Sequence, residues 1–176
     1  MSTYESAASR LHIHIASQRL ALVSADGASV FERPVSTALN GPGEQNASGC
    51  TPRGLHYIRA KIGEGLPPDT VFIARRPTGE IYSPALAASY PERDWILSRI
   101  LWLCGCETGK NRGSGVDSFR RFIYIHGTPD TEPMGIPRSH GCIRMRNADV
   151  VDLYSRVRPG TPVSIHRNPP LNRENR

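Results

Sequence analysis

A cysteine flanked by glycine and histidine carries the clearest chemistry in this chain. It is Cys142, in the run Ser139-His140-Gly141-Cys142-Ile143-Arg144, and a second histidine, His126, closes an apolar run upstream. A thiol becomes a strong nucleophile when it loses its proton, and an imidazole is the usual acceptor of that proton. Gly141 allows a tight turn, and the amides of Gly141 and Cys142 are placed to stabilise charge on an attacked carbonyl oxygen. The pattern predicts a cysteine-dependent acyl-transfer site.

Two histidines compete for the role of general base. His140 is two residues from Cys142 and shares its face in an extended segment, whereas His126 comes from the end of a separate strand. The residues alone leave this choice open. Arg144 favours the thiolate electrostatically, and its planar guanidinium suits a substrate carboxylate, the alternative being a surface salt bridge. Ser139 is expected to stabilise the turn through a hydrogen bond to the backbone.

A metal site is the main rival for the same residue types. Zinc is bound by histidine and cysteine, and the candidate ligands are His126, His140, Cys142 and His166. Their spacing matches no standard zinc pattern, and Cys104-Gly105-Cys106 is not a CxxC motif. We therefore expect neither a metal nor a cofactor.

The motif and its surroundings resemble the L,D-transpeptidase catalytic domain (YkuD-type). The resemblance extends from about Leu11 to His166, which is nearly the whole chain. Its core is His126-Gly127-Thr128, Gly135-Ile136-Pro137, the Ser139–Met145 run and Asn147; its flanks are Gln18–Leu22, Thr51-Pro52-Arg53-Gly54 and Val163-Ser164-Ile165.

The resemblance assigns roles within the site. It implies that His126 is the general base and that the carbonyl of Gly127 orients it, while His140 and Gly141 position the loop and the oxyanion. Arg144, Ser139 and Asn147 are the expected substrate-binding residues. The family is independent of metal, which agrees with the expectation drawn from spacing.

The resemblance also implies a reaction. Cys142 would form an acyl-enzyme with tetrapeptide stems of peptidoglycan and transfer it to an amine, which gives a 3-3 cross-link. Carbapenems would acylate the same cysteine. An L,D-carboxypeptidase that uses water as acceptor, or a non-catalytic peptidoglycan-binding module, is the alternative. The substrate places such an enzyme in the cell envelope or periplasm.

Composition narrows the classes of partner. The 176 residues carry a net charge of +6, with a pI near 9.5. The arginines are scattered, so a nucleic-acid partner is not expected. The resemblance implies a carboxylate-rich cell wall as the partner, and a basic protein would stay near it. No apolar run approaches the length of a membrane span, and residues 1–6 lack the features of a signal peptide, which keeps a cytoplasmic location open. We expect a monomer.

The elements that must position the site are mostly strands. Short alternating runs between turn formers predict a mainly β domain over residues 10–166, a curved β-sandwich with one or two short helices, between disordered residues 1–9 and 167–176. In the first strand, His12 and His14 are expected to face outward. A helix is expected to begin at Asn147 as N-cap and to bury one face. The expected strands are 11–15, 19–23, 29–35, 55–59, 70–74, 96–103, 121–125 and 161–165.

Overall fold

The computed structural model describes residues 9–168. Apart from Ser9, Arg167 and Asn168, the segments predicted to be disordered, 1–9 and 167–176, lie outside the described residues. Within that range the chain forms ten strands and two helices. Their order is β1 Arg10–His14, β2 Arg19–Val23, β3 Ser29–Pro34, β4 Gly54–Ile62, β5 Thr70–Ile73, β6 Arg76–Ile81, α1 Pro84–Ser89, β7 Ile96–Gly105, β8 Tyr124–Thr128, β9 Ile143–Arg146, α2 Asn147–Arg156 and β10 Pro162–His166. Neither helix is long and apolar enough to cross a membrane.

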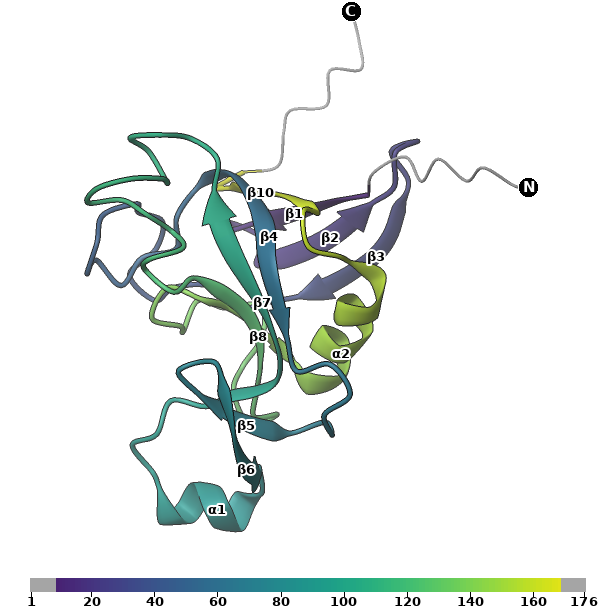
Figure 1. Ribbon diagram of the computed structural model, residues 1–176, viewed down its shortest axis with the longest axis vertical. Helices are drawn as coiled ribbons and strands as arrows, with labels where there is room; N and C mark the ends of the chain where they lie inside the picture. The colour runs from purple at the N-terminus through teal and green to yellow at the C-terminus, as the bar shows by residue number, and fades with distance from the viewer. Residues whose placement is uncertain (1–8, 169–176) are drawn as a thin grey trace, which may run out of the picture.

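All ten strands belong to one curled sheet. Its order is β3-β2-β1-β10-β4-β7-β5-β6, and β8 branches from β7 and pairs with β9. The β1–β10 and β8–β9 pairs are parallel. Helix α2 packs against β7, β8 and β9, and Figure 1 shows it lying inside the curl of the sheet. The predicted mainly β fold is confirmed, with the walls of the predicted sandwich supplied by a single sheet that bends on itself.

Strand β7 is the branch point of the sheet. One edge pairs with β4 and, nearer the start of β7, with β5, and the other edge pairs with β8. The register on β8 shifts between Leu97 and Ile100, and Ser98 there has a φ of 68°. A bulge of this kind bends the strand and strengthens its twist. As a result β5, β6 and α1 form a separate unit, seen at the lower end of Figure 1.

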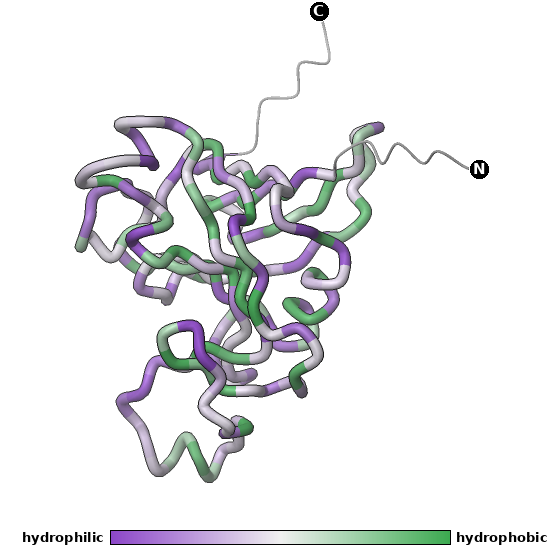
Figure 2. The backbone as a smooth tube through the Cα atoms, viewed as in Figure 1, coloured by the Kyte–Doolittle hydropathy of each residue, from purple (hydrophilic) through white to green (hydrophobic). Residues whose placement is uncertain are grey.

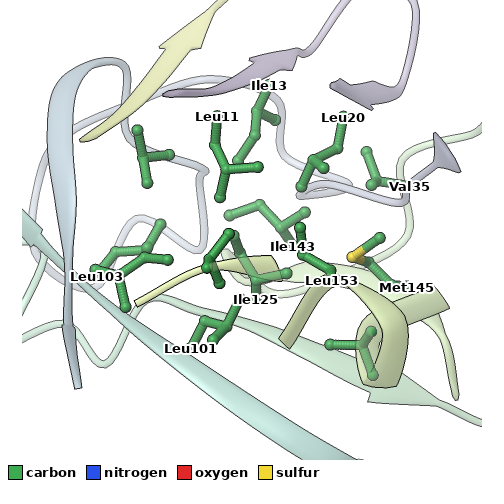
Figure 3. Packing of buried hydrophobic residues seen from close by; sticks show 14 of the residues in the cluster. Leu11, Ile13, Leu20, Val35, Leu101, Leu103, Ile125, Ile143, Met145 and Leu153 are labelled. Carbon is green, nitrogen blue, oxygen red and sulfur yellow. The ribbon is translucent and has the colours of Figure 1, made fainter. Parts of the chain in front are cut away.

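The core fills the inside of the curl. Buried residues alternate with more exposed ones along β1 and β2, and Figure 2 colours each residue of the backbone by its hydropathy. Figure 3 shows that the inward side chains come from opposite walls and meet α2. Those with no exposed surface include Leu11 and Ile13 of β1, Leu101 and Leu103 of β7, Ile125 of β8, Ile143 and Met145 of β9, and Leu153 of α2. His12 and His14 alternate with the buried residues of β1, so they lie on the other face of the sheet, as predicted.

The prediction that Asn147 is the N-cap of helix α2 is wrong. Asn147 is its first residue, and Arg146 occupies the N-cap position without a side-chain cap. The amide of Asn147 is used elsewhere: its Oδ1 accepts from Ser98 Oγ at 2.7 Å and its Nδ2 donates to the carbonyl of Thr128 at 3.0 Å. The helix nevertheless buries Val150, Leu153 and Tyr154, as its spacing predicts.

Other differences lie in short elements. The strand predicted for 121–125 begins only at Tyr124, because Phe122 has a positive φ of 56°. Strands β6 and β9 and helix α1 were not predicted. The N-terminus of helix α1 carries a recognisable sequence signal, a serine N-cap followed by a proline. Ser83 Oγ accepts from Leu86 N at 3.1 Å, and Pro84 follows the cap.

Candidate active site

Two parallel strands bring the predicted nucleophile and base to one face of the sheet. On β8 and β9, Ile125 pairs with Ile143 and His126 pairs with Arg144. The isoleucines point into the core, so residues one position away point to the opposite face. His126 and Arg144 therefore share that face, and Cys142, which immediately precedes β9, extends the same row.

The thiol of Cys142 lies between two backbone groups of the chain that leads into β8. Its Sγ donates to the carbonyl of Phe122 at 3.3 Å and accepts from the amide of Tyr124 at 3.4 Å. The side chain is half-buried and packs against a small cluster that contains Ile100 and Tyr124. The positive φ of Phe122 is unusual for a bulky residue, and it occurs where the carbonyl of Phe122 meets the thiol.

The imidazole of His126 is held in one orientation and one tautomer. It is buried, with 3% of its surface exposed, and its Nδ1 lies 2.7 Å from the carbonyl oxygen of Gly127. A carbonyl only accepts hydrogen bonds, so Nδ1 carries the proton and Nε2 carries the lone pair. Gly127 permits this packing because a Cβ there would lie 2.6 Å from the carbonyl oxygen of Leu97 and closer still to Asn147 Oδ1.

The turn before Cys142 is fixed by three hydrogen bonds that involve the side chains of Ser139 and Thr51. Gly141 has a φ of +131°, a conformation that L-residues rarely adopt. Ser139 Oγ accepts from the amide of Gly141 at 3.2 Å and donates to the carbonyl of Cys142 at 2.5 Å. Thr51 Oγ donates to the carbonyl of Gly141 at 2.9 Å. Ser139 thus stabilises the turn as expected, and it occupies the amide of Gly141.

Arg144 lies in a network of charged groups beside the thiol. Only 8% of its side chain is exposed, and it contacts Asp94 Oδ1 at 2.9 Å and Glu132 Oε2 at 3.4 Å. The other oxygen of Asp94 lies 3.2 Å from Nδ1 of His140, whose side chain is 78% exposed. Asp94 therefore connects the predicted substrate-binding arginine with the predicted loop-positioning histidine.

The electrostatics of the site favour a neutral pair at rest. Burial, together with the charge of Asp94, raises the pKa of the Cys142 thiol to about 11, against the hydrogen bond from Tyr124 and the charge of Arg144. Burial also lowers the pKa of His126, against its hydrogen bond to Gly127. The favourable charge of Arg144, expected from the sequence, is thus outweighed by burial. The resting site holds a thiol and a neutral imidazole.

The rival metal set is not assembled. His166 is on β10 and pairs in register with His14, on the outer face of the sheet, whereas Cys142, His126 and His140 belong to the β8–β9 side. Across residues 9–168, no group of three or more histidine, cysteine or acidic residues is arranged to hold a metal ion.

Three contributors to the site were missed or underestimated from the sequence. Thr51 was noted only as part of a turn, although its hydroxyl supports Gly141. Asp94 carries no motif, and its role depends on a loop that packs back on the site. Phe122 was expected to be an ordinary strand residue, and a positive φ at a phenylalanine has no sequence signal.

The chain resembles known proteins in sequence and in fold. The family described as the L,D-transpeptidase catalytic domain (YkuD) matches residues 8–165. The chain is 51% identical over 43 residues to a putative L,D-transpeptidase YkuD of Bacillus subtilis, which is 24% of this chain and 26% of that protein. It is 44% identical over 48 residues to a probable L,D-transpeptidase YcfS of Escherichia coli, which is 27% of this chain and 15% of that protein.

Solved structures share the fold at low identity. An L,D-transpeptidase from Mycobacterium smegmatis has a TM-score of 0.54 and 19% identity, over 90% of this chain and 58% of that one. L,D-transpeptidase 3 from Mycobacterium tuberculosis, in complex with a faropenem-derived adduct, has a TM-score of 0.54 and 17% identity, over 90% and 60%. The chain thus spans less than two thirds of these relatives. Because the family match covers nearly all of the described residues, this chain belongs to the L,D-transpeptidase catalytic domain (YkuD) family.

Proposed function

We propose that this protein is a cysteine-dependent L,D-transpeptidase acting on peptidoglycan stem peptides in the cell envelope. The observation that carries the proposal is the pairing of a half-buried thiol with a histidine whose Nε2 is left unprotonated by the Nδ1 hydrogen bond to Gly127. Both lie on one face of neighbouring strands, in a chain of the matching family.

The proposed acylation moves one proton and exchanges one bond. Cys142 Sγ attacks the carbonyl carbon of the third stem residue, usually meso-diaminopimelate, and its proton passes to Nε2 of His126. The thiol must first leave the carbonyl of Phe122, to which it donates at rest. The C–N bond to D-alanine then breaks, D-alanine departs with the proton from His126, and a thioester remains on Cys142.

In the second half-reaction an amine of a neighbouring stem attacks the thioester. His126 Nε2 accepts the proton of that amine, and the thiolate of Cys142 is released and reprotonated. The amide of Cys142 stabilises the oxyanion in both halves, because the amide of Gly141 is occupied by Ser139. The product is a 3-3 cross-link.

The predicted substrate-binding residues take a positioning role in this proposal. The side chains of Arg144, Ser139 and Asn147 are all engaged by protein partners. Arg144 holds Asp94, Ser139 shapes the turn, and Asn147 braces the carbonyl of Thr128 beside Gly127. His140, predicted to position the loop, is exposed and lies 3.2 Å from Asp94, so its side chain is open to substrate.

If water instead of an amine attacks the thioester, the protein is an L,D-carboxypeptidase with the same nucleophile. If Cys142 does not react, the protein is a non-catalytic peptidoglycan-binding module. Incubation with a disaccharide-tetrapeptide, followed by mass spectrometry of the products, separates the three. Cross-linked dimer in the wild type, absent with Cys142→Ala, supports the transpeptidase. Tripeptide without dimer would identify the protein as an L,D-carboxypeptidase instead. The absence of any product from folded protein would contradict the assignment as an enzyme. A relative carries a faropenem-derived adduct, and we propose that penems and carbapenems likewise acylate Cys142.

A further inference from the structure

An arginine occupies a strained turn next to the active site. The β5–β6 hairpin reverses through Ala74 and Arg75, whose φ values are 46° and 70°. Turns with positive φ at both central positions favour asparagine and glycine, because a Cβ is strained there. An alanine and an arginine therefore cost stability at this position, and strain of this kind clusters at functional sites.

The side chain of Arg75 reaches from this turn onto an aromatic surface. Its guanidinium carbon lies 4.7 Å from the centre of the Trp102 ring and 4.8 Å from that of Phe122. Its Nη1 donates to the hydroxyl of Tyr124 at 3.0 Å. Trp102 is held in turn by Phe119, since the rings stack at 3.9 Å and Trp102 Nε1 donates to the carbonyl of Phe119 at 3.1 Å. The guanidinium plane is thus fixed by contacts with its faces and one corner.

The same residues border the nucleophile. Phe122 supplies the carbonyl and Tyr124 the amide that hydrogen-bond to Cys142 Sγ. Trp102 and the thiol belong to one packed cluster with Tyr124. Phe122 is 49% exposed, so this surface is open to a ligand. Arg75 is therefore separated from the reacting sulfur by only one layer of residues.

The charge of Arg75 is not neutralised within residues 9–168. A guanidinium has five N–H donors, and in this part of the chain one hydrogen bond, to Tyr124, uses one of them. The described ion pairs of Arg53, Arg93, Arg144 and other arginines do not include Arg75. A fixed, half-exposed guanidinium with free N–H groups matches a carboxylate, which it binds with two parallel hydrogen bonds.

We propose that Arg75 binds a carboxylate of the peptide that acylates Cys142. The proposal rests on the proposed function and adds a specificity residue to it. The two residues that flank the scissile bond each carry one carboxylate: the C-terminal carboxylate of D-alanine and the side-chain carboxylate of the third residue. Binding either of them fixes the peptide across the Phe122 surface, with its scissile carbonyl at Cys142.

Three donor peptides distinguish the two carboxylates. They are the disaccharide-tetrapeptide, its C-terminal amide, and an analogue with lysine as the third residue, which lacks the side-chain carboxylate. The kcat/KM for release of D-alanine or its amide is measured for the wild type, Arg75→Gln and Arg75→Lys. Arg76→Gln is the matched control, because Arg76 is the exposed next residue of the same hairpin and loses the same charge. Thermal unfolding verifies that each variant is folded.

We expect the wild type to prefer the tetrapeptide over one analogue by about 10- to 100-fold, the usual effect of a charge-assisted hydrogen bond. Arg75→Gln removes that preference by slowing the two peptides that keep the bound carboxylate and not the analogue that lacks it, Arg75→Lys restores part of it, and Arg76→Gln keeps all of it. The carboxylate that Arg75 binds is the one missing from the analogue that the wild type disfavours and that Arg75→Gln no longer disfavours. Equal slowing of all three peptides by Arg75→Gln, or no slowing, overturns the proposal while leaving the proposed function intact. If the wild type turns over none of the peptides, the proposed function fails and the role of Arg75 fails with it.

Discussion

The imidazole of His126 donates its Nδ1 proton to the carbonyl oxygen of Gly127 across 2.7 Å. This one contact fixes the ring and leaves Nε2 free to accept a proton. It joins adjacent residues of β8, so the base is oriented by the strand that carries it. The close packing over Gly127 keeps that strand in place, because β7 and Asn147 leave no space for a side chain there.

Replacing Gly127 with alanine should therefore damage both stability and activity. The new Cβ would meet the carbonyl oxygen of Leu97 at 2.6 Å, and backbone atoms do not yield cheaply. We expect the free energy of unfolding to fall by about 1–3 kcal/mol, the usual cost of overpacking. Urea unfolding measures the first effect, and turnover of the tetrapeptide by the remaining folded protein measures the second. Unchanged unfolding would show that the strand relaxes freely, contrary to the packing described.

The pKa of the Cys142 thiol leads to a pH-dependent test of the resting state. Because this pKa is raised to about 11, the thiolate is scarce at neutral pH. The rate of alkylation of Cys142 by iodoacetamide should therefore keep rising with pH up to a midpoint of about 11. Cys50, Cys104 and Cys106 are also free, so the modified peptides must be resolved by mass spectrometry. A midpoint at or below neutral pH would indicate a preformed thiolate–imidazolium pair.

Asp94 should hold back the reactivity of the thiol. Its negative charge raises the pKa of Cys142, and it contacts Arg144 at 2.9 Å. Asp94→Asn removes the charge and should lower the pKa of Cys142, so alkylation at pH 8 becomes several-fold faster. Asp130→Asn, at an exposed position, is the matched control and should leave the rate unchanged. An equal effect of the two variants would reduce the role of Asp94 to general surface charge.

The proton affinity of His56 predicts how stability changes with pH. His56 is 2% exposed and hydrogen-bonds through its ring nitrogens to Gly54 O and Ser118 Oγ. Burial lowers its pKa from 6.5 to about 4. Between these values the unfolded chain binds a proton that the folded protein does not, so stability is lost as pH falls from 6.5 towards 4, by up to about 3 kcal/mol.

Urea unfolding at pH 7 and pH 4.5 measures that loss, and His56→Gln should reduce it. If the variant shows the same loss between the two pH values as the wild type, His56 is not its source.

Local sequence patterns predicted most of the sheet but not its branch point. Strand β1 can be predicted because Leu11 and Ile13 alternate with histidines, and this two-residue period matches its alternating burial. The bulge at Ser98 depends on the pairing of β7 with β4 and β5 on one edge and with β8 on the other, which no short window contains. Strand β6 is largely exposed and carries no apolar alternation, so it gave no signal.

The candidate site divides in the same way. Cys142, His126 and Gly127 belong to short motifs whose chemistry can be read from residue types. The contacts that tune them come from distant segments: Thr51 lies 90 positions from Gly141, and Asp94 lies 50 positions from Arg144. Arg75 illustrates the limit most clearly, because only the folded hairpin brings its guanidinium to the aromatic residues beside the thiol.

Trapping the acyl-enzyme tests the central claim most directly. The protein is mixed with the disaccharide-tetrapeptide without an added acceptor, quenched in acid, and examined by intact mass spectrometry and peptide mapping. We predict a tripeptide thioester on Cys142 that forms with loss of D-alanine, disappears when an acceptor amine is added, and is absent from Cys142→Ala. An adduct that maps to another residue, or product formation that persists in Cys142→Ala, would contradict the assignment of Cys142 as the nucleophile.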